Sequence, residues 1–320
     1  MLKNNEYINK IINQDSLEFL KNIQENSVDI VLTDPPYFLD KMDNKWNVDR
    51  VHNDKNLHTI KSLPAGMKFD KNQGKRFYKW YLKISEELYR VLKPGGFFFS
   101  FSSPRLYHRM ACAIEDAGFD IRDCFMWLYT MNQPKGMSLN HFIKKLDMSD
   151  FEKNRLIKTL SGWKTPQVKS CFEPIAMAQK PVDKTFLNNM MRHNVSLVNT
   201  SIKHGKDQNM HPANVVSSQN ISPIIDRAFL TGKPNKKEKG AGNTHKTVKP
   251  LSICKYLISL TTKTGAVVLD PFLGSGTTAV ACKMMDRNYI GIELNKEYIK
   301  IAQYRLDKIK DNKNRLEMIV

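Results

Sequence analysis

Two short segments of the chain carry residue types that could do chemistry. In the first, Asp270–Thr277 (DPFLGSGT), two glycines stand between a strand-like apolar run and a helix-like run. Glycines at such a turn let a ligand approach the backbone, and the free N–H groups of the helix that follows favour an anionic group. Glu293 follows the next apolar run, where a carboxylate could accept hydrogen bonds from ribose hydroxyls. The combination predicts a nucleoside-containing cofactor.

The spacing of this glycine loop limits which cofactor it could hold. No Lys follows Gly276, so a P-loop and NTP hydrolysis are not expected. A dinucleotide fingerprint would have a third glycine where Ala279 stands, and since Ala is tolerated there in some cases, NAD remains an alternative at this point. A tight strand-to-helix turn that holds no ligand is another alternative.

The second segment is Asp34-Pro35-Pro36-Tyr37, directly after the apolar run Val28–Leu32. Its prolines stiffen the loop, so that an acid, two carbonyls and an aromatic ring are held in a fixed relation. This set suits a planar ligand with an exocyclic amine, because Asp34 and the Pro35 carbonyl can accept its two N–H groups while Tyr37 stacks on its face. The alternative is an Asx-type turn that only ends a strand.

Strands and helices must alternate around both segments. Apolar periodicity predicts strands over residues 7–12, 28–32, 97–101, 121–128, 266–269 and 289–292. It predicts helices that begin near residues 16, 77, 104, 250, 278 and 296, with a long polar loop over 38–75. This order indicates an α/β fold with a mostly parallel sheet and helices on both faces. Ligands bind at the carboxyl ends of such strands, so we expect the acidic residues that follow them to share one edge: Asp15, Asp34, Asp270 and Glu293.

Composition indicates a folded chain with a polyanionic partner. The 320 residues are 41% hydrophobic, which excludes disordered and collagen-like classes and allows a full core without a metal or disulfide staple. The 50 Lys and Arg exceed the 32 Asp and Glu by 18, and residues 131–249 account for +12 of this excess. Nucleic acid is the simplest partner for such a charge. A general bias towards Lys and Asn is the alternative.

The cysteines and histidines predict neither disulfides nor a metal. The five cysteines form no CxxC pair and are odd in number, which favours a reducing, cytoplasmic compartment. The eight histidines have no metal-ligand spacing, so no metal is expected. No apolar run reaches the length of a membrane span, and the first residues lack the apolar stretch of a signal peptide.

Together, the two segments resemble the amino-group DNA methyltransferases, which use S-adenosylmethionine. Three further segments are similar to that family: residues 13–20 (NQDSLEFL), 91–96 (VLKPGG) and 245–250 (HKTVKP), where Lys246 stands in place of the more usual Pro. The resemblance covers residues 1–130 and 243–310. The order of the motifs is similar to the β group of the family, which implies a Rossmann-like methyltransferase sheet that is circularly permuted.

The resemblance also implies roles for single residues. Asp34, Pro35, Pro36 and Tyr37 would hold a flipped target base. Glu293 would bind the ribose hydroxyls of the cofactor and Asp15 its adenine amine, while Thr247 and Lys249 would lie near its methionine end. The loop that shapes the cofactor pocket would consist of Asp270, Phe272, Gly274, Ser275, Gly276 and Thr277.

The implied reaction is methyl transfer to N6 of adenine in double-stranded DNA. In this family, DPPY is more typical of enzymes that methylate adenine and SPPY of those that methylate cytosine. Adenine is therefore expected, and N4 of cytosine is the alternative. Carbon-5 methylation is disfavoured because the chain lacks a Pro-Cys dipeptide. An RNA or protein methyltransferase, and a DNA-binding protein without catalysis, are rivals from other classes. Homodimers are common in the family. The sequence does not show whether this chain forms a homodimer or is paired with a cognate restriction endonuclease.

The predicted organisation places a recognition region between two halves of one catalytic domain. Residues 1–130 would form the catalytic half, 131–245 the target-recognition insert and 246–320 the cofactor-binding half. The insert would be interrupted near 171–181, which resembles a family strand that returns to the sheet. Solvated surface charge is the alternative for each candidate DNA contact: Trp163, Lys164, Arg192, Lys203, Arg227, Lys236 and Lys237.

Overall fold

The computed structural model describes residues 6–37, 71–129, 137–165, 171–202, 214–216, 234–239, 243, 245 and 248–309. Its strands are β1 (Lys10–Ile12), β2 (Val28–Thr33), β3 (Leu92–Phe101), β4 (Asp120–Leu128), β5 (Phe172–Gln179), β6 (Val215–Val216), β7 (Val267–Asp270) and β8 (Asn288–Ile292). The helices are α1 (Ser16–Leu20), α3 (Lys71–Val91), α4 (Tyr107–Asp116), α5 (Asn140–Ile143), α6 (Asp150–Thr159), α7 (Phe186–His193), α8 (Lys236–Lys239), α9 (Leu251–Thr261), α10 (Thr277–Met284) and α11 (Lys296–Asp307).

All these strands belong to one sheet, in the order β1-β8-β7-β2-β3-β5-β4-β6. β5 runs antiparallel to its neighbours β3 and β4, and the other pairs are parallel. The predicted α/β fold with a mostly parallel sheet is therefore confirmed. Because β5 runs the opposite way, its first residues lie at the edge where the parallel strands end.

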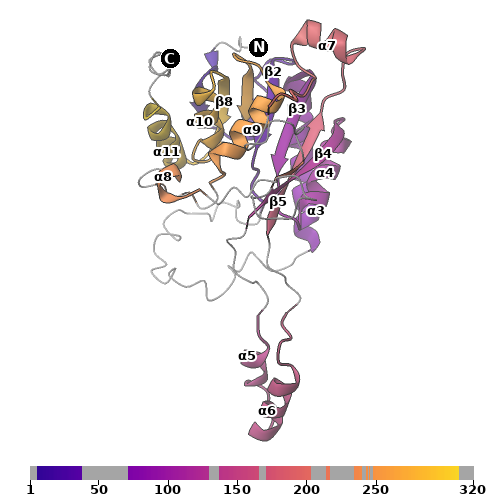
Figure 1. The fold of residues 1–320 in the computed structure, drawn as a ribbon, viewed down its shortest axis with the longest axis vertical. Helices are drawn as coiled ribbons and strands as arrows, with labels where there is room; N and C mark the ends of the chain where they lie inside the picture. Colours follow the sequence, from indigo (N-terminus) through magenta and orange to yellow (C-terminus); the bar gives the residue numbers. More distant parts are fainter. Residues whose placement is uncertain are drawn as a thin grey trace.

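The sheet is buried on both faces, since apolar side chains alternate between two cores along its central strands. Ile30, Leu32 and Phe99 belong to the core that α9, α10 and α11 cover. Val31 and Phe98 belong to the other core, which α1, α3 and α4 cover. Figure 1 shows α9 and α10 in front of the sheet, with α3 and α4 on its right-hand side. Such a scaffold holds the strand ends in fixed relation.

Some predicted boundaries are wrong for local reasons. The first strand begins at Lys10 rather than residue 7, because Asn9 adopts a left-handed conformation with φ of 59° that ends the preceding turn. The long polar loop does not extend to residue 75, because α3 begins at Lys71. Lys71–Arg76 carry no apolar periodicity of their own, so the sequence predicts the start of the helix only near residue 77. In the structure the helix extends back through these residues.

The chain between β4 and β5 carries a protruding pair of helices, which we call the α5–α6 arm (residues 137–165). Figure 1 shows the arm extending away from the sheet, at the opposite end of the molecule from α7. The base of the arm is closed by a β-bridge between Ser138 and Lys164. Of the helices described, none is long and apolar enough to cross a membrane.

Candidate active site

Four neighbouring parallel strands bring the predicted acidic residues to one edge. β1, β8, β7 and β2 are adjacent in that order, and each runs parallel to the next. Their carboxyl ends lead to Asp15, Glu293, Asp270 and Asp34, respectively. Residues that are up to 278 positions apart in sequence therefore line one edge of the sheet, where a parallel α/β sheet binds its ligands.

The glycine loop after β7 is held by backbone contacts. The Gly274 N–H donates to Glu293 Oε2 at 2.8 Å, and the Asn295 N–H donates to Glu293 Oε1 at 2.7 Å. Gly274 has a φ of 56°, and a Cβ there would meet His245 Nε2 at 2.8 Å. Gly276, the N-cap of α10, has a φ of 84°, and a Cβ there would meet the Ala302 Cβ at 2.7 Å. Only glycine fits both positions.

Asp270 ties this loop to the strand that precedes Asp34. Thr33 Oγ1 donates to Asp270 Oδ1 at 2.8 Å, and the Phe272 N–H donates to the same oxygen at 3.0 Å. Burial raises the pKa of Asp270 to about 6, although hydrogen bonds from Thr278, Thr33 and Phe272 oppose the rise. Since Thr33 immediately precedes Asp34, the two segments singled out in the sequence are one hydrogen bond apart.

The start of α1 closes the other side of the glycine loop. Asp15 caps the helix, because its Oδ1 accepts the Glu18 N–H at 3.2 Å. Ser16 Oγ donates to the Pro271 carbonyl at 2.5 Å. The carboxylate of Glu293 lies across the loop, and burial raises the pKa of this group even though backbone N–H groups oppose the rise. Free carboxylate lone pairs and a glycine cradle fit a ribonucleoside with hydroxyl and amine donors.

Asp34 stands in a compact polar cluster. The Tyr37 hydroxyl donates to Asp34 Oδ1 at 2.6 Å, and Lys249 Nζ donates to Asp34 Oδ2. Burial raises the pKa of Tyr37 well above its usual value, and the charge of Asp34 adds to the rise, so the hydroxyl remains a donor. Burial lowers the pKa of Lys249, but the carboxylates of Asp34 and Glu173 outweigh it and the pKa is raised overall. Lys249 therefore remains an ammonium group.

The structure adds residues that were not predicted for the site. Glu173, at the start of β5, places Oε2 3.3 Å from Lys249 Nζ. Its signal in the sequence was a charged residue at the start of a buried apolar strand. Thr33 carried no such signal, since its role depends on which strand lies beside β2.

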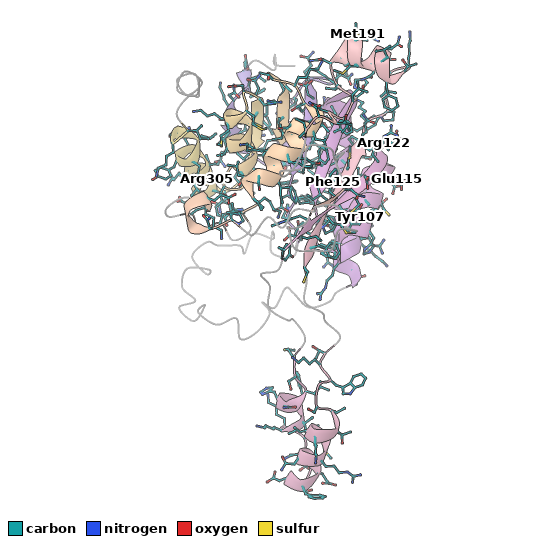
Figure 2. All side chains as sticks on the ribbon, in the orientation of Figure 1. Tyr107, Glu115, Arg122, Phe125, Met191 and Arg305 are labelled. Atoms are coloured by element: carbon teal, nitrogen blue, oxygen red, sulfur yellow. The ribbon has the colours of Figure 1, made fainter. Side chains whose placement is uncertain are left out.

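His245 and Arg305 also contact the glycine loop. His245 lies over Gly274 and packs edge-on against the Tyr298 ring, with centroids 4.5 Å apart. Burial lowers the pKa of His245 to about 4, so the ring is neutral at pH 7. Arg305 Nη1 donates to the Ser275 carbonyl at 2.6 Å and to Thr277 Oγ1 at 3.1 Å. Arg305 belongs to α11 and is labelled in Figure 2. Both side chains thus contact the glycine loop from parts of the chain outside it.

Comparison with known proteins identifies the family. A family model described as DNA methylase matches residues 28–304, which is most of the chain. The chain belongs to the DNA methylase family. This methylase is 30% identical over 325 residues to the Type II methyltransferase M.HindIII of Haemophilus influenzae, a match that covers 95% of this chain and 97% of the relative. It is 29% identical to the Type II methyltransferase M.HpaI of Haemophilus parainfluenzae, over 93% of this chain and 74% of the relative.

Solved structures share the fold of the methylase. The M1.HpyAVI–SAM complex superposes with a TM-score of 0.53 at 22% identity, covering 93% of this chain and 98% of that chain. The cytosine-N4-specific PvuII DNA methyltransferase superposes with a TM-score of 0.56 at 17% identity, covering 97% and 89%. The predicted Rossmann-like methyltransferase sheet is thereby confirmed. The methylase uses S-adenosylmethionine, and DNA is its substrate, as the sequence predicted.

The predicted DNA contacts of the methylase are not all brought to this edge. Trp163, which is 70% exposed, and Lys164 lie at the base of the α5–α6 arm. Arg192 lies on α7 and pairs with Asp183 at 2.5 Å, at the end of the molecule opposite the arm (Figure 1). Lys236 and Lys237 belong to α8, with side chains outside the description, and Lys203, Arg227 and Thr247 lie outside the described residues.

Two further residues expected near the cofactor are described. Lys249, expected near the methionine end of the cofactor, has its ammonium group beside Asp34 and Glu173. Phe272 lies in the glycine loop, where its ring centroid is 5.4 Å from that of Trp80 on α3. Within the part of the chain that the structure describes, no three His, Cys, Asp or Glu side chains cluster as a metal site requires.

Proposed function

We propose that this methylase transfers the methyl group of S-adenosylmethionine to the exocyclic N6 of adenine in double-stranded DNA, after the base is flipped out of the duplex. The observation that carries the proposal is the hydrogen bond between Thr33 and Asp270. It joins the strand end that leads to the base-holding loop to the strand end that leads to the cofactor loop. Methyl donor and acceptor can therefore lie side by side at one edge of the sheet.

The base-holding loop acts on the nitrogen that accepts the methyl group. The lone pair of an exocyclic amine is delocalised into its ring, which makes the nitrogen a poor nucleophile. If Asp34 and the Pro35 carbonyl accept both N–H groups, they favour a pyramidal nitrogen with an available lone pair. Asp34 is also placed to accept the proton that the nitrogen loses on methylation. Stacking on Tyr37 would offset part of the few kcal/mol that flipping costs.

The glycine loop would hold the cofactor by its nucleoside and its charged end. Glu293, after the carboxyl end of β8, would accept hydrogen bonds from the ribose hydroxyls. Asp15, after the carboxyl end of β1, would accept one from the adenine amine. Ser275 and Thr277 would present backbone N–H groups where α10 begins, since those of Gly274 and Gly276 donate to Glu293 and to the Leu273 carbonyl. The chemistry that S-adenosylmethionine supplies when bound is an electrophilic methyl group. Orientation and electrostatics then suffice, and no covalent enzyme intermediate is needed.

Adenine is preferred to cytosine because the DPPY segment at residues 34–37 resembles that of adenine enzymes, whereas SPPY is typical of cytosine enzymes in this family. The similarity to the PvuII enzyme bears on the fold only, at 17% identity. Methylation of N4 of cytosine is the second candidate function.

The three-part organisation supports the same proposal. Residues 1–130 and 246–320 would form the methyltransferase domain, and 131–245 the recognition insert, with β5 within it returning to the sheet. The parallel pairing of β1, the first strand, with β8, the last strand described, supports a circularly permuted order of motifs. Joining the two ends would make one continuous series of strands and helices.

We also propose a reducing, cytoplasmic setting and two protein partners. All five cysteines are free thiols, which suits such a compartment. A homodimer follows from the family resemblance, and a cognate restriction endonuclease from the relatives named as Type II methyltransferases. Light scattering of the purified chain would test the dimer.

The test of the reaction is transfer of labelled methyl from S-adenosylmethionine to genomic DNA that lacks native methylation, followed by nucleoside analysis. N6-methyladenine is the expected product. N4-methylcytosine would overturn the base assignment while keeping the mechanism. Label in RNA or protein acceptors, with none in DNA, would overturn the substrate.

A further inference from the structure

The polar cluster at Asp34 contains a carboxylate to which the reaction as proposed gives no role. Glu173 is the second residue of the antiparallel strand β5, so it lies at the edge where the parallel strands end. Its Oε2 is buried and makes no hydrogen bond to any described residue, while Lys249 Nζ lies 3.3 Å away. A buried carboxylate is costly unless it is paired, so its place beside the site requires a reason.

Asp34 is already occupied in this structure. Tyr37 donates to its Oδ1 and Lys249 to its Oδ2, and the ammonium group neutralises the carboxylate that a target amine would use. A buried ion pair between Asp34 and Lys249 alone would be neutral, and separating it would leave two uncompensated charges. The ammonium group therefore needs a second acceptor within reach before Asp34 can receive the base.

We propose that Glu173 is a positioning residue that holds Lys249 and receives its ammonium group when the target amine reaches Asp34. This inference rests on the proposed function. Lys249 Nζ already lies between both carboxylates, and its aliphatic stem is buried, so a small shift of Nζ would exchange one partner for the other. The rings of Tyr37 and Phe101, with centroids 5.8 Å and 5.2 Å from Nζ, line the path of that shift.

The charge of the cluster supports the same role. The cluster combines two carboxylates with one ammonium group and therefore has an excess of negative charge. In the reaction, positive charge moves from the sulfur of the methyl donor to the target nitrogen. A preorganised negative cluster beside that nitrogen stabilises the charge that develops there, whereas a neutral Asp34–Lys249 pair would not. Glu173 thus both frees Asp34 and sets the sign of the local field.

The first test is Glu173→Gln, which keeps the shape of the side chain and removes its charge. We expect kcat for DNA methylation to fall about 10-fold or more, while the Kd for S-adenosylmethionine and the melting temperature stay close to those of the unmodified chain. Glu115→Gln, an exposed carboxylate on α4 labelled in Figure 2, is the matched control and should leave all three quantities unchanged. Activity of Glu173→Gln within twofold of the unmodified chain would overturn the inference.

A double mutant separates this role from a merely structural one. Each single change, Glu173→Gln or Lys249→Met, should lower kcat. If Glu173 acts through Lys249, then adding Glu173→Gln to a Lys249→Met chain should lower kcat by less than a further twofold. An equal loss in both backgrounds would overturn the inference. Inactivity of the unmodified chain would instead refute the proposed function, so the two failures are distinguishable.

Discussion

The two loops at the active edge are built in opposite ways. The loop after β7 is held by backbone groups: Glu293 binds the Gly274 N–H, and Arg305 binds the Ser275 carbonyl. The loop after β2 is held by charged side chains, since Asp34 is bound by Tyr37 and by Lys249. Backbone contacts fix a shape that is ready for its ligand. The side-chain contacts of Asp34 include an ammonium group, which neutralises the carboxylate that a ligand must use.

This difference indicates that the two sites meet their ligands differently. The cofactor loop is complete before binding, whereas Asp34 must exchange partners before it can hold a base. Substitutions in the first loop should therefore act on cofactor affinity, and those in the second on the rate of transfer. Variants that separate these two quantities test the comparison.

The largest effect is expected from Asp34→Ala. The change removes the acceptor for the target amine, and the rate of methyl transfer should fall at least about 100-fold, as for loss of one preorganised group. Cofactor affinity should stay within twofold, because Asp34 does not contact the glycine loop. Labelled-methyl transfer and calorimetric titration would measure the two. Turnover near that of the unmodified chain would disprove the base-holding role.

Gly274→Ala should have the opposite signature. Its φ of 56° strains a side chain, and the new Cβ would meet His245 Nε2 at 2.8 Å. We expect the Kd for S-adenosylmethionine to rise about 10-fold, which corresponds to about 1.4 kcal/mol. Gly162→Ala is the control, because Gly162 also has a positive φ, of 87°, but nothing lies within 4 Å of its Cβ position. An equal Kd for both variants would refute the close packing of His245 on this loop.

Arg305→Met should loosen the same loop less severely. The change removes donors to Ser275 and Thr277 and keeps most of the apolar stem. We expect the Kd for S-adenosylmethionine to rise about fivefold and the free energy of unfolding to fall by about 1–3 kcal/mol. Lys308→Met, one turn further along the chain, controls for loss of positive charge. A change in transfer rate without a change in Kd would contradict the assignment.

His245 gives a pH test of the packing. Between pH 6.5 and 4 the unfolded chain binds a proton on this ring and the folded chain does not, so its burial destabilises the fold as pH falls through that window. The stability of the unmodified chain relative to His245→Gln should therefore decrease by up to about 3 kcal/mol from pH 7 to pH 4. Denaturant unfolding of both chains across this range would measure it. A difference that is independent of pH would show that the ring is not held neutral.

The smallest effect concerns DNA. Trp163→Ala, on the α5–α6 arm, should weaken DNA binding about two- to fivefold and leave the melting temperature unchanged, because the ring is 70% exposed. Met191→Ala is the control on α7, where the side chain is 81% exposed at the opposite end of the molecule (Figure 2). Equal DNA affinity of both variants would remove Trp163 from the recognition surface.

Local patterns in the sequence predicted most of the fold. The Phe97–Phe101 run and the spacing of α3 appear as expected, because burial leaves a strong apolar signal. The strand near 171–181, which was expected from the family resemblance, is present as β5. The gathering of four acidic residues at one edge followed from parallel strands alone. The start of β1 was misplaced because one asparagine with a left-handed backbone looks like any other polar residue in a strand.

What the sequence could not reveal depends on contacts across the sheet. Nothing near Lys249 indicates that its ammonium group would bind Asp34, which is 215 residues earlier. Glu173 reaches the site only because β5 runs against its neighbours, and direction is a property of the whole sheet. Thr33 and Arg305 likewise act on residues that are adjacent only after folding.

The antiparallel course of β5 has a consequence for how such a protein can vary. Since β4 ends and β5 begins at the active edge, the chain leaves and re-enters the sheet at one place, and the α5–α6 arm is a detour between two fixed points. The arm can be lengthened, shortened or replaced without altering the pairing of β4 with β5. The sheet can thus stay constant while the segment inserted beside the active edge varies.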